Sequence, residues 1–133
     1  MFTLDPRLAA DTIEVTRLPL CRVLLMDDAN WPWLILVPER VGAVEIFDLS
    51  APDRAVLIEE MARAAAILKD VTGALKINVG ALGNVVRQLH VHVIARFEND
   101  PAGTAPVWGA APRRPWKPDD AERFLEGLRT RLA

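Results

Sequence analysis

The sequence predicts an α+β domain in which helices cover an antiparallel sheet. Two short apolar runs form one pair of segments, and two runs with β-branched residues and alternation form a second, with a turn region between the members of each pair, which is typical of β-hairpins. Between the two pairs lies a long segment whose apolar residues recur at three- and four-residue spacing, which indicates an amphipathic helix. The predicted order along the chain is therefore α, β, β, α, β, β, α.

Length and composition favour one compact unit. With 133 residues, 51% of them hydrophobic and 26% charged, the chain can bury a core of its own, and we expect residues 1–133 to form a single domain. A net charge of −2 provides no basic surface for long nucleic acid. The apolar runs are too short to span a membrane, and neither a secretion signal nor a cysteine pair is evident, so we expect a cytoplasmic protein without membrane association.

The first three elements are a short helix and a hairpin. Residues 5–15 predict a helix that Asp5 caps, with Pro6 at the first helical position, where a missing N–H does no harm. The apolar runs 21–26 and 33–37 are separated by Asp, Asn and Pro residues, and we expect them to be paired strands. Because neither run alternates with polar residues, each is expected to be buried on both faces or covered by a helix on one of them.

The long helix is predicted over residues 50–73. Ser50 can cap its start, Pro52 lies just inside it, and Gly73 ends it. The expected packing stripe consists of Leu57, Met61, Ala64, Leu68 and Val71. The charged side chains of this helix, including Glu60, are expected to lie away from the stripe.

The C-terminal half predicts a second hairpin and a last helix. Residues 74–81 and 88–97 are strand-like, and residues 82–87 form the turn between them. A proline-rich stretch over about 99–118 predicts an irregular arm, and residues 119–132 predict an amphipathic helix.

The only two histidines of the chain lie two residues apart in the second strand of that hairpin. On a regular strand Gln88, His90, His92 and Ile94 share one face, while the apolar residues between them face the long helix. Residues two apart are separated by ~6.5 Å, which is close enough to hold a small anion between two imidazoles.

The histidine pair alone leaves three interpretations open. The two residues can simply be half-exposed strand residues. They can belong to a metal site, which needs a further ligand, and the candidates are Cys21, Glu98 and Asp100. They can also serve covalent catalysis, in which a neutral imidazole attacks phosphorus while the second imidazole and an amide hold the phosphate oxygens.

The string 88–94, Gln-Leu-His-Val-His-Val-Ile, resembles the signature of the histidine triad (HIT) superfamily of nucleotidyl hydrolases and transferases. That signature is His-x-His-x-His followed by two apolar residues. The resemblance covers most of the chain, since segments 21–28, 33–40 and 77–84 and the long helix occur in the same order, with Pro38 ending the second apolar strand.

The resemblance implies the fold and the partners. It implies a HIT-like antiparallel sheet of about five strands, one long covering helix and a C-terminal helix. It implies a nucleotide or nucleoside-phosphate conjugate as ligand, with no cofactor and no metal. Related proteins are usually homodimers in which the strands after the long helix pair across the two-fold axis, and we expect the same arrangement here.

The resemblance also implies residue roles. His90 matches the nucleophile, which forms a covalent nucleotidyl-histidine, and His92 matches a histidine that contacts phosphate oxygens. Asn78 and Asn84 match positions whose amides contact phosphate. Asp27 lies near the position of the ribose-binding acid, although its neighbour Asp28 is an equal candidate because the connecting loop is short. Turn formation is the alternative role for these Asn and Asp residues.

Two departures from the family pattern concern proton transfer. Gln88 stands where the first histidine of the motif is expected, and an amide cannot titrate near neutral pH. Trp33 stands where many members carry a further histidine, and it is a candidate for stacking on a base. Gly83 belongs to the candidate binding turn, and Trp108 is a candidate cover for the site or contact with a partner subunit.

Two functional hypotheses follow, with a third kept as the least favoured. The first is an enzyme that cleaves a phosphoramidate or phosphoanhydride bond through a covalent intermediate on His90. The second is a nucleotide-binding module with little or no turnover, because the first histidine of the motif is Gln88. The third is a His-x-His metal-binding domain.

Overall fold

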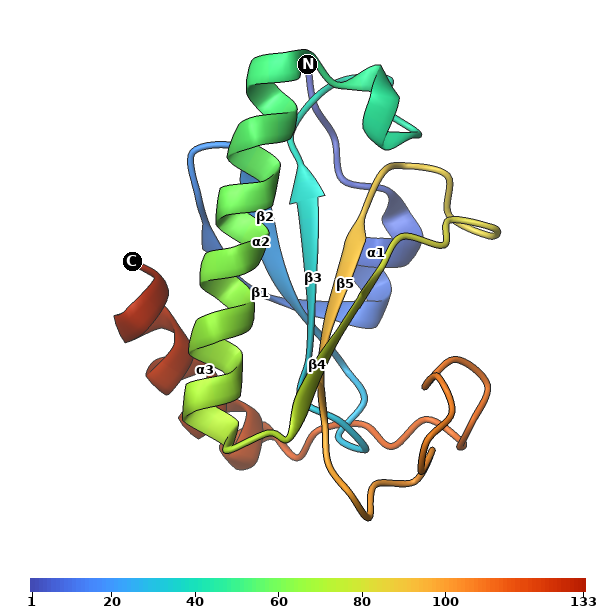
Figure 1. Ribbon diagram of the computed structural model, residues 1–133, viewed down its shortest axis with the longest axis vertical. Coiled ribbons are helices and arrows are strands. Elements are labelled where there is room, and N and C mark those ends of the chain that lie inside the picture. The colour runs from blue at the N-terminus through green and yellow to red at the C-terminus, as the bar shows by residue number, and fades with distance from the viewer.

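The computed structural model describes residues 1–133, and its centre is a five-stranded antiparallel sheet (Figure 1). The sheet has the order β1-β2-β3-β5-β4, formed by β1 (Thr12–Arg17), β2 (Cys21–Met26), β3 (Trp33–Pro38), β4 (Lys76–Gly80) and β5 (Val91–Arg96). The helices are α1 (Pro6–Asp11), α2 (Ala51–Thr72) and α3 (Pro118–Leu132), with a short 3₁₀ helix η1 (Ile46–Asp48). The predicted α+β class, with about five strands, a long covering helix and a C-terminal helix, is confirmed.

Helix α2 begins and ends where its capping residues predict. The Ser50 side chain accepts a hydrogen bond from the Asp53 N–H, and Gly73 ends the helix in the left-handed region at φ 69°. The prediction for Glu60 was wrong, because this carboxylate is buried beneath the sheet edge. It accepts hydrogen bonds from the N–H groups of Leu20 and Cys21, at 3.0 and 2.8 Å, and so satisfies the turn between β1 and β2.

The prediction for the N-terminal segment was correct at its start and wrong at its end. Asp5 caps α1 as expected, but the helix ends at Asp11 and strand β1 follows directly. Strand β1 pairs with β2, with Thr12 opposite Met26 and Ile13 opposite Leu25. The β-branched residues of this segment favour a strand, and pairing with β2 supplies their hydrogen bonds, so the helix cannot continue.

The sheet is buried on both faces, and each face has its own core. On one face β2, β3 and β5 pack against α2 and α3. On the other face lies a smaller core beneath α1, the N-terminal segment and the arm, with members Leu8, Leu24, Trp31, Trp33, Ile35, Val37, Ile94 and Val107. All six residues of β3 and all six of β5 are therefore buried, as the lack of alternation predicts for β3.

Residues 97–117 connect β5 to α3 without a helix or strand, and polar contacts fix the path of this arm. At its start the buried Arg96 binds both carboxylate oxygens of Asp100, at 2.8 and 3.1 Å. Near its end Arg113 donates to the carboxylate of Asp27 at 2.8 Å. The arm then holds Val107 and Trp108 against the second core. None of the helices is both long enough and apolar enough to cross a membrane.

Candidate active site

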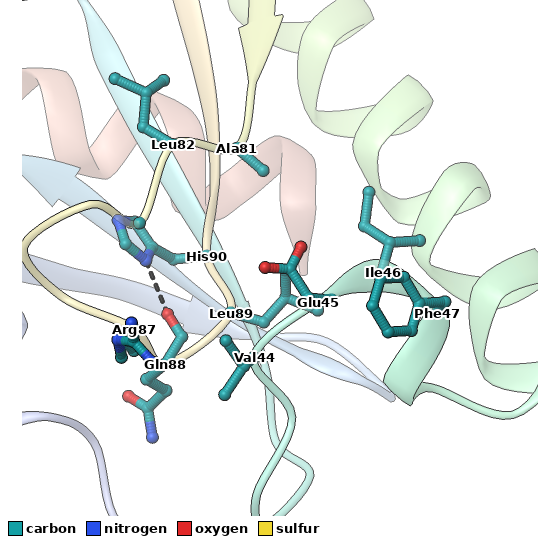
Figure 2. Close-up of a pocket in the computed structure, with 11 residues that line it drawn as sticks. Val44, Glu45, Ile46, Phe47, Ala81, Leu82, Arg87, Gln88, Leu89 and His90 are labelled. Carbon is teal, nitrogen blue, oxygen red and sulfur yellow. Dashed lines mark hydrogen bonds between the residues drawn. The ribbon is translucent and has the colours of Figure 1, made fainter.

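His90 lies immediately before β5, at the end of the sheet where β3 finishes. Strand β5 begins at Val91, so Gln88 and His90 belong to the segment that leads into the strand, and their predicted place within the strand was wrong. Figure 2 shows the His90 ring turned back onto its own chain, with Nδ1 2.7 Å from the carbonyl oxygen of Gln88. Because a carbonyl oxygen only accepts, Nδ1 carries the proton and Nε2 keeps its lone pair.

His90 is one of the residues that line a cavity of about 170 Å³. The cavity lies between the loop 44–47 and the segment 81–89, which come from opposite sides of α2 in the sequence (Figure 2). Its volume is below the ~300–1,000 Å³ of pockets that enclose a drug-sized ligand, so it can enclose part of a nucleotide conjugate and leave the remainder on the open surface. His90 is 7% exposed and is one of the residues that line this cavity.

His92 lies two residues after His90, and the two ring centroids are 5.0 Å apart. Its Nδ1 atom is 2.9 Å from Nε1 of Trp33, and an indole N–H can only donate. Nδ1 of His92 is therefore the acceptor, and the proton of this imidazole is on Nε2. Burial, and then the neighbouring His90, lower the pKa of His92 to about 4, so this ring is neutral at pH 7.

Aromatic side chains surround His92 on the second face of the sheet. The ring centroid of Trp108 is 5.2 Å from that of His92, with the two rings edge-on. The ring centroid of Trp33 is 5.6 Å from that of His92. Trp33 also contacts Trp31 at 6.1 Å and is only 5% exposed. With so little of its ring accessible, Trp33 is placed to bind His92 rather than to stack on a base, the role for which it was a candidate.

Gln88 uses its side-chain amide to hold the N-terminal segment. Its Oε1 atom accepts from the N–H of Asp5 and its Nε2 atom donates to the carbonyl of Thr3, both at 2.8 Å. The amide thus bonds to the segment as a peptide group of a neighbouring strand would. Phe2 and Leu4 on this segment pack against the second core. Gln88 lines the cavity, but both polar atoms of its side chain are already hydrogen-bonded to the N-terminal segment.

Truncation of Gln88 tests this anchoring role. In Gln88→Ala we expect the N-terminal segment to detach, because its backbone loses two hydrogen bonds that are each worth about 1 kcal/mol. Hydrogen exchange of the amides in residues 2–5 should become faster, while amides of β5 keep their protection. Unchanged exchange in residues 2–5 would contradict the assignment. Gln88→Glu, which keeps the length but removes the donor to Thr3, should give an intermediate result.

The remaining predicted residues are brought together only in part. Gly83 lines the cavity at φ 71°, and a Cβ atom there would lie 3.2 Å from the carbonyl oxygen of Val86, so glycine suits this turn twice over. Asn84 follows it, exposed and without a hydrogen-bond partner among the protein atoms. Asn78 lies on β4, where its Oδ1 atom accepts from Arg96 at 2.8 Å, and it borders a different hollow.

The structure does not place Asp27 with the histidines. It follows β2 near the start of β3, whereas His90 lies near the end of β3, so the two occupy opposite ends of the sheet. The Asp27 carboxylate accepts from Arg113 and from the N–H of Trp116, each at 2.8 Å. The alternative Asp28 is buried and accepts from Asn30. Asp28 thus has the turn-forming role that was its alternative, whereas the Asp27 carboxylate holds the distant arm.

Two contributors to the cavity were not predicted from the sequence. The loop 44–47 carries Glu45 and Phe47, and Phe47 is 77% exposed. Arg87 also lines the cavity, and its exposed side chain forms no ion pair or hydrogen bond. Phe47 is the only residue of this loop that could have suggested a binding role from the sequence. That role is recognised only once the fold brings the loop and Leu82 to the same cavity.

The histidines are not part of a metal-ligand cluster. No group of three or more His, Cys, Asp or Glu side chains is arranged to hold a metal ion. Cys21 lies in the core on the α2 face, and Asp100 is bound by Arg96. The ligands proposed for a metal site therefore do not gather around the histidine pair.

Comparison with known proteins places this arrangement in context. A family model described as the HIT domain matches residues 7–99. A histidine triad protein from Bradyrhizobium japonicum is 44% identical, with 99% of this chain and 98% of that chain covered and a TM-score of 0.98. A histidine triad (HIT) protein from Sinorhizobium meliloti 1021 is 51% identical, with 98% and 96% covered and a TM-score of 0.96.

More distant structures share the fold. A hypothetical histidine triad nucleotide-binding protein from Sulfolobus tokodaii is 17% identical, with 91% of this chain and 83% of that chain covered and a TM-score of 0.69. No curated protein matches the chain.

Proposed function

Because the chain belongs to the HIT domain family, most of whose members are nucleotidyl hydrolases or transferases, we propose that it cleaves a phosphoramidate or phosphoanhydride bond in a nucleotide conjugate. His90 is the nucleophile of this reaction and carries the nucleotidyl group as a covalent intermediate. No cofactor or metal takes part. The observation that supports the proposal is the pair of tautomers, which gives His90 a lone pair on Nε2 and His92 a proton on Nε2.

The chemistry proceeds in two displacements. Nε2 of His90 attacks phosphorus, the bond from phosphorus to the leaving nitrogen or oxygen breaks, and the leaving group departs with the bonding electrons. His92 donates its Nε2–H to a phosphoryl oxygen as negative charge develops there. A water molecule then attacks phosphorus, the bond from phosphorus to Nε2 breaks and returns its electron pair to His90, and the water's proton passes to the solvent as the nucleotide is released.

Protonation of the leaving group is the weak step of this mechanism. Gln88 cannot act as an acid and is bound to the N-terminal segment. His92 is neutral near pH 7, so it donates a hydrogen bond and has no second proton to transfer. The leaving group must then take its proton from water, and we expect slow turnover.

Incubation with adenosine 5′-phosphoramidate tests the proposal. Release of AMP, together with a nucleotidyl adduct on the peptide that contains His90, is the expected result, measured by chromatography and by mass spectrometry after acid-free quenching. The alternative function, a nucleotide-binding module, is favoured by the engagement of Gln88 and predicts AMP binding by calorimetry with neither adduct nor release. Stoichiometric zinc binding without nucleotide binding would contradict both.

We also propose a homodimer that extends the sheet at β4. This strand lies at one edge of the sheet, so one row of its backbone groups is unpaired. Leu75 and Val79 beside that edge are 67% and 49% exposed. Pairing of β4 with its copy would bury these side chains and satisfy the backbone groups.

A lysine on the β4 edge is expected to break this dimer. In Val79→Lys the like charges of two copies would meet at the interface, and sedimentation velocity should show a shift from dimer to monomer. Thr16→Lys places the same charge on β1, the opposite edge, and should leave the dimer intact. A dimer that survives Val79→Lys and dissociates in Thr16→Lys would place the interface at β1 and contradict the proposal.

A further inference from the structure

The Nδ1 atoms of the two histidines have partners of opposite kinds, an acceptor at His90 and a donor at His92. His90 faces a carbonyl oxygen through Nδ1 at 2.7 Å, whereas His92 faces an indole N–H through Nδ1 at 2.9 Å. A neutral imidazole has one proton for two nitrogens, and the partner of Nδ1 decides which nitrogen holds it. The first partner leaves a lone pair on Nε2 of His90, and the second leaves a proton on Nε2 of His92.

We propose that Trp33 is a positioning residue that holds His92 as the Nε2–H tautomer, so that His92 always presents a hydrogen-bond donor to the phosphoryl group. Its effect on rate rests on the proposed function, but its effect on the tautomer does not. In the other tautomer Nε2 of His92 would present a lone pair to negatively charged oxygens, which would repel the transition state. The indole N–H does not titrate in the physiological range, so this control holds at any pH at which the protein is folded and His92 is neutral.

The surroundings of the pair make Trp33 the group that sets this tautomer. Both side chains are 5% exposed, so water has little access to compete for Nδ1. Trp33 at the start of β3 pairs with Ile94, and His92 lies two residues before Ile94 on the same face of the sheet, which brings the indole to the imidazole. The other indole beside His92 belongs to Trp108, and its Nε1 atom has no hydrogen-bond partner. Trp108 therefore supplies apolar cover but no proton.

This contact also bears on the departure from the family pattern at position 33. The resemblance places a histidine there in many members, and its replacement suggested a loss of proton transfer. The indole restores one part of what a histidine can do, namely the donation of a hydrogen bond to Nδ1 of His92. It cannot restore the other part, since it neither accepts nor releases a proton near neutral pH.

The tautomer can be measured directly in the wild-type protein. Long-range ¹H–¹⁵N spectra of protein with ¹⁵N-labelled histidine distinguish a protonated ring nitrogen from one with a lone pair. We expect Nε2 of His92 and Nδ1 of His90 to be the protonated atoms at pH 7. A proton on Nδ1 of His92 would overturn the inference, whether or not the protein is an enzyme.

Two matched variants test the role of the indole N–H. Trp33→Phe keeps an aromatic ring and removes the donor, and we expect His92 to populate both tautomers and kcat to fall about tenfold with little change in KM, because only part of the population then presents a donor. Trp108→Phe removes an indole from the same imidazole without removing a hydrogen bond, and the tautomer of His92 should stay as in the wild type.

The outcomes separate the inference from the proposed function. If the wild type does not turn over but shows the expected tautomers, which Trp33→Phe alone disturbs, the function fails and the control of the tautomer stands. If the wild type turns over and Trp33→Phe keeps both its kcat and a single Nε2–H tautomer, the inference fails. Should Trp33→Phe not fold, the wild-type spectrum decides.

Discussion

Replacement of His90 by alanine is expected to lower kcat/KM for adenosine 5′-phosphoramidate by roughly 10⁴-fold or more, because the covalent route is lost with the nucleophile. His90 lines the cavity, and the bond from its Nδ1 atom to the Gln88 carbonyl oxygen leaves the lone pair of the neutral ring on Nε2. Among the other nitrogen-bearing side chains that line the cavity, Arg87 is cationic and Gln88 is a poor nucleophile. Steady-state rates and the mass of the trapped adduct measure the effect.

His92→Ala is the matched comparison for this prediction. It removes the donor to the phosphoryl oxygens but not the nucleophile, so the adduct on His90 should still form, with kcat lower by about 10²-fold to 10³-fold. His90→Ala should form no adduct and should still bind AMP, which shows that the variant is folded. Equal and measurable rates for wild type and His90→Ala would reject His90 as the nucleophile.

Local signals in the sequence were sufficient for most of the fold. The limits of α2 follow from Ser50 and Gly73, whose effects act over only a few residues. Strand β1 was not predicted because it is short and follows a helix directly, and its pairing with β2 is what ends that helix at Asp11. Glu60 was misplaced for a similar reason, since its acceptor role depends on a turn some 40 residues away in the chain.

The candidate site also combines features that local sequence predicts with contacts that it does not. Alternation along a strand was enough to place His92 on the face opposite α2, and the apolar residues between the motif positions lie in the core against α2. The partners that determine what the site residues do are distant in sequence: Gln88 bonds to Thr3, and Asp27 bonds to Arg113. Such contacts leave no periodic pattern in the sequence, so they emerge only from the folded chain.

Replacement of Asp100 by alanine is expected to destabilise the protein by about 3–5 kcal/mol, because it leaves the buried Arg96 without its counter-ion. The side chains of Arg96 and Asp100 are only 8% and 4% exposed. Arg96 also donates to Asn78 and to the carbonyl of Gly103, and Asp100 also accepts from the N–H groups of Phe97 and Ala102. The variant thus loses a charge and the acceptor that shapes the start of the arm.

Dependence on pH gives this prediction a second readout. The Arg96 guanidinium, bonded to Asp100, holds the pKa of that carboxyl well below its usual range, against the opposing effect of burial. A carboxyl whose pKa is lower in the folded state stabilises the protein above its unfolded pKa, near 3.9, and this contribution is lost as pH falls through the folded pKa. Urea unfolding should therefore show the largest difference between wild type and Asp100→Ala near pH 7, and a smaller difference at the lowest pH at which both still fold.

The surface pair of Arg131 and Asp70 provides the control for burial. Its closest atoms are also 2.8 Å apart, but the side chains are 46% and 70% exposed, so water screens the attraction. Asp70→Ala should cost less than about 1 kcal/mol by the same urea measurement. Equal losses in the two variants would show that the Asp100 contact contributes no more than an exposed ion pair. A large loss in Asp100→Ala alone ties the stability of the arm, and with it the position of Trp108 beside His92, to one buried charge pair.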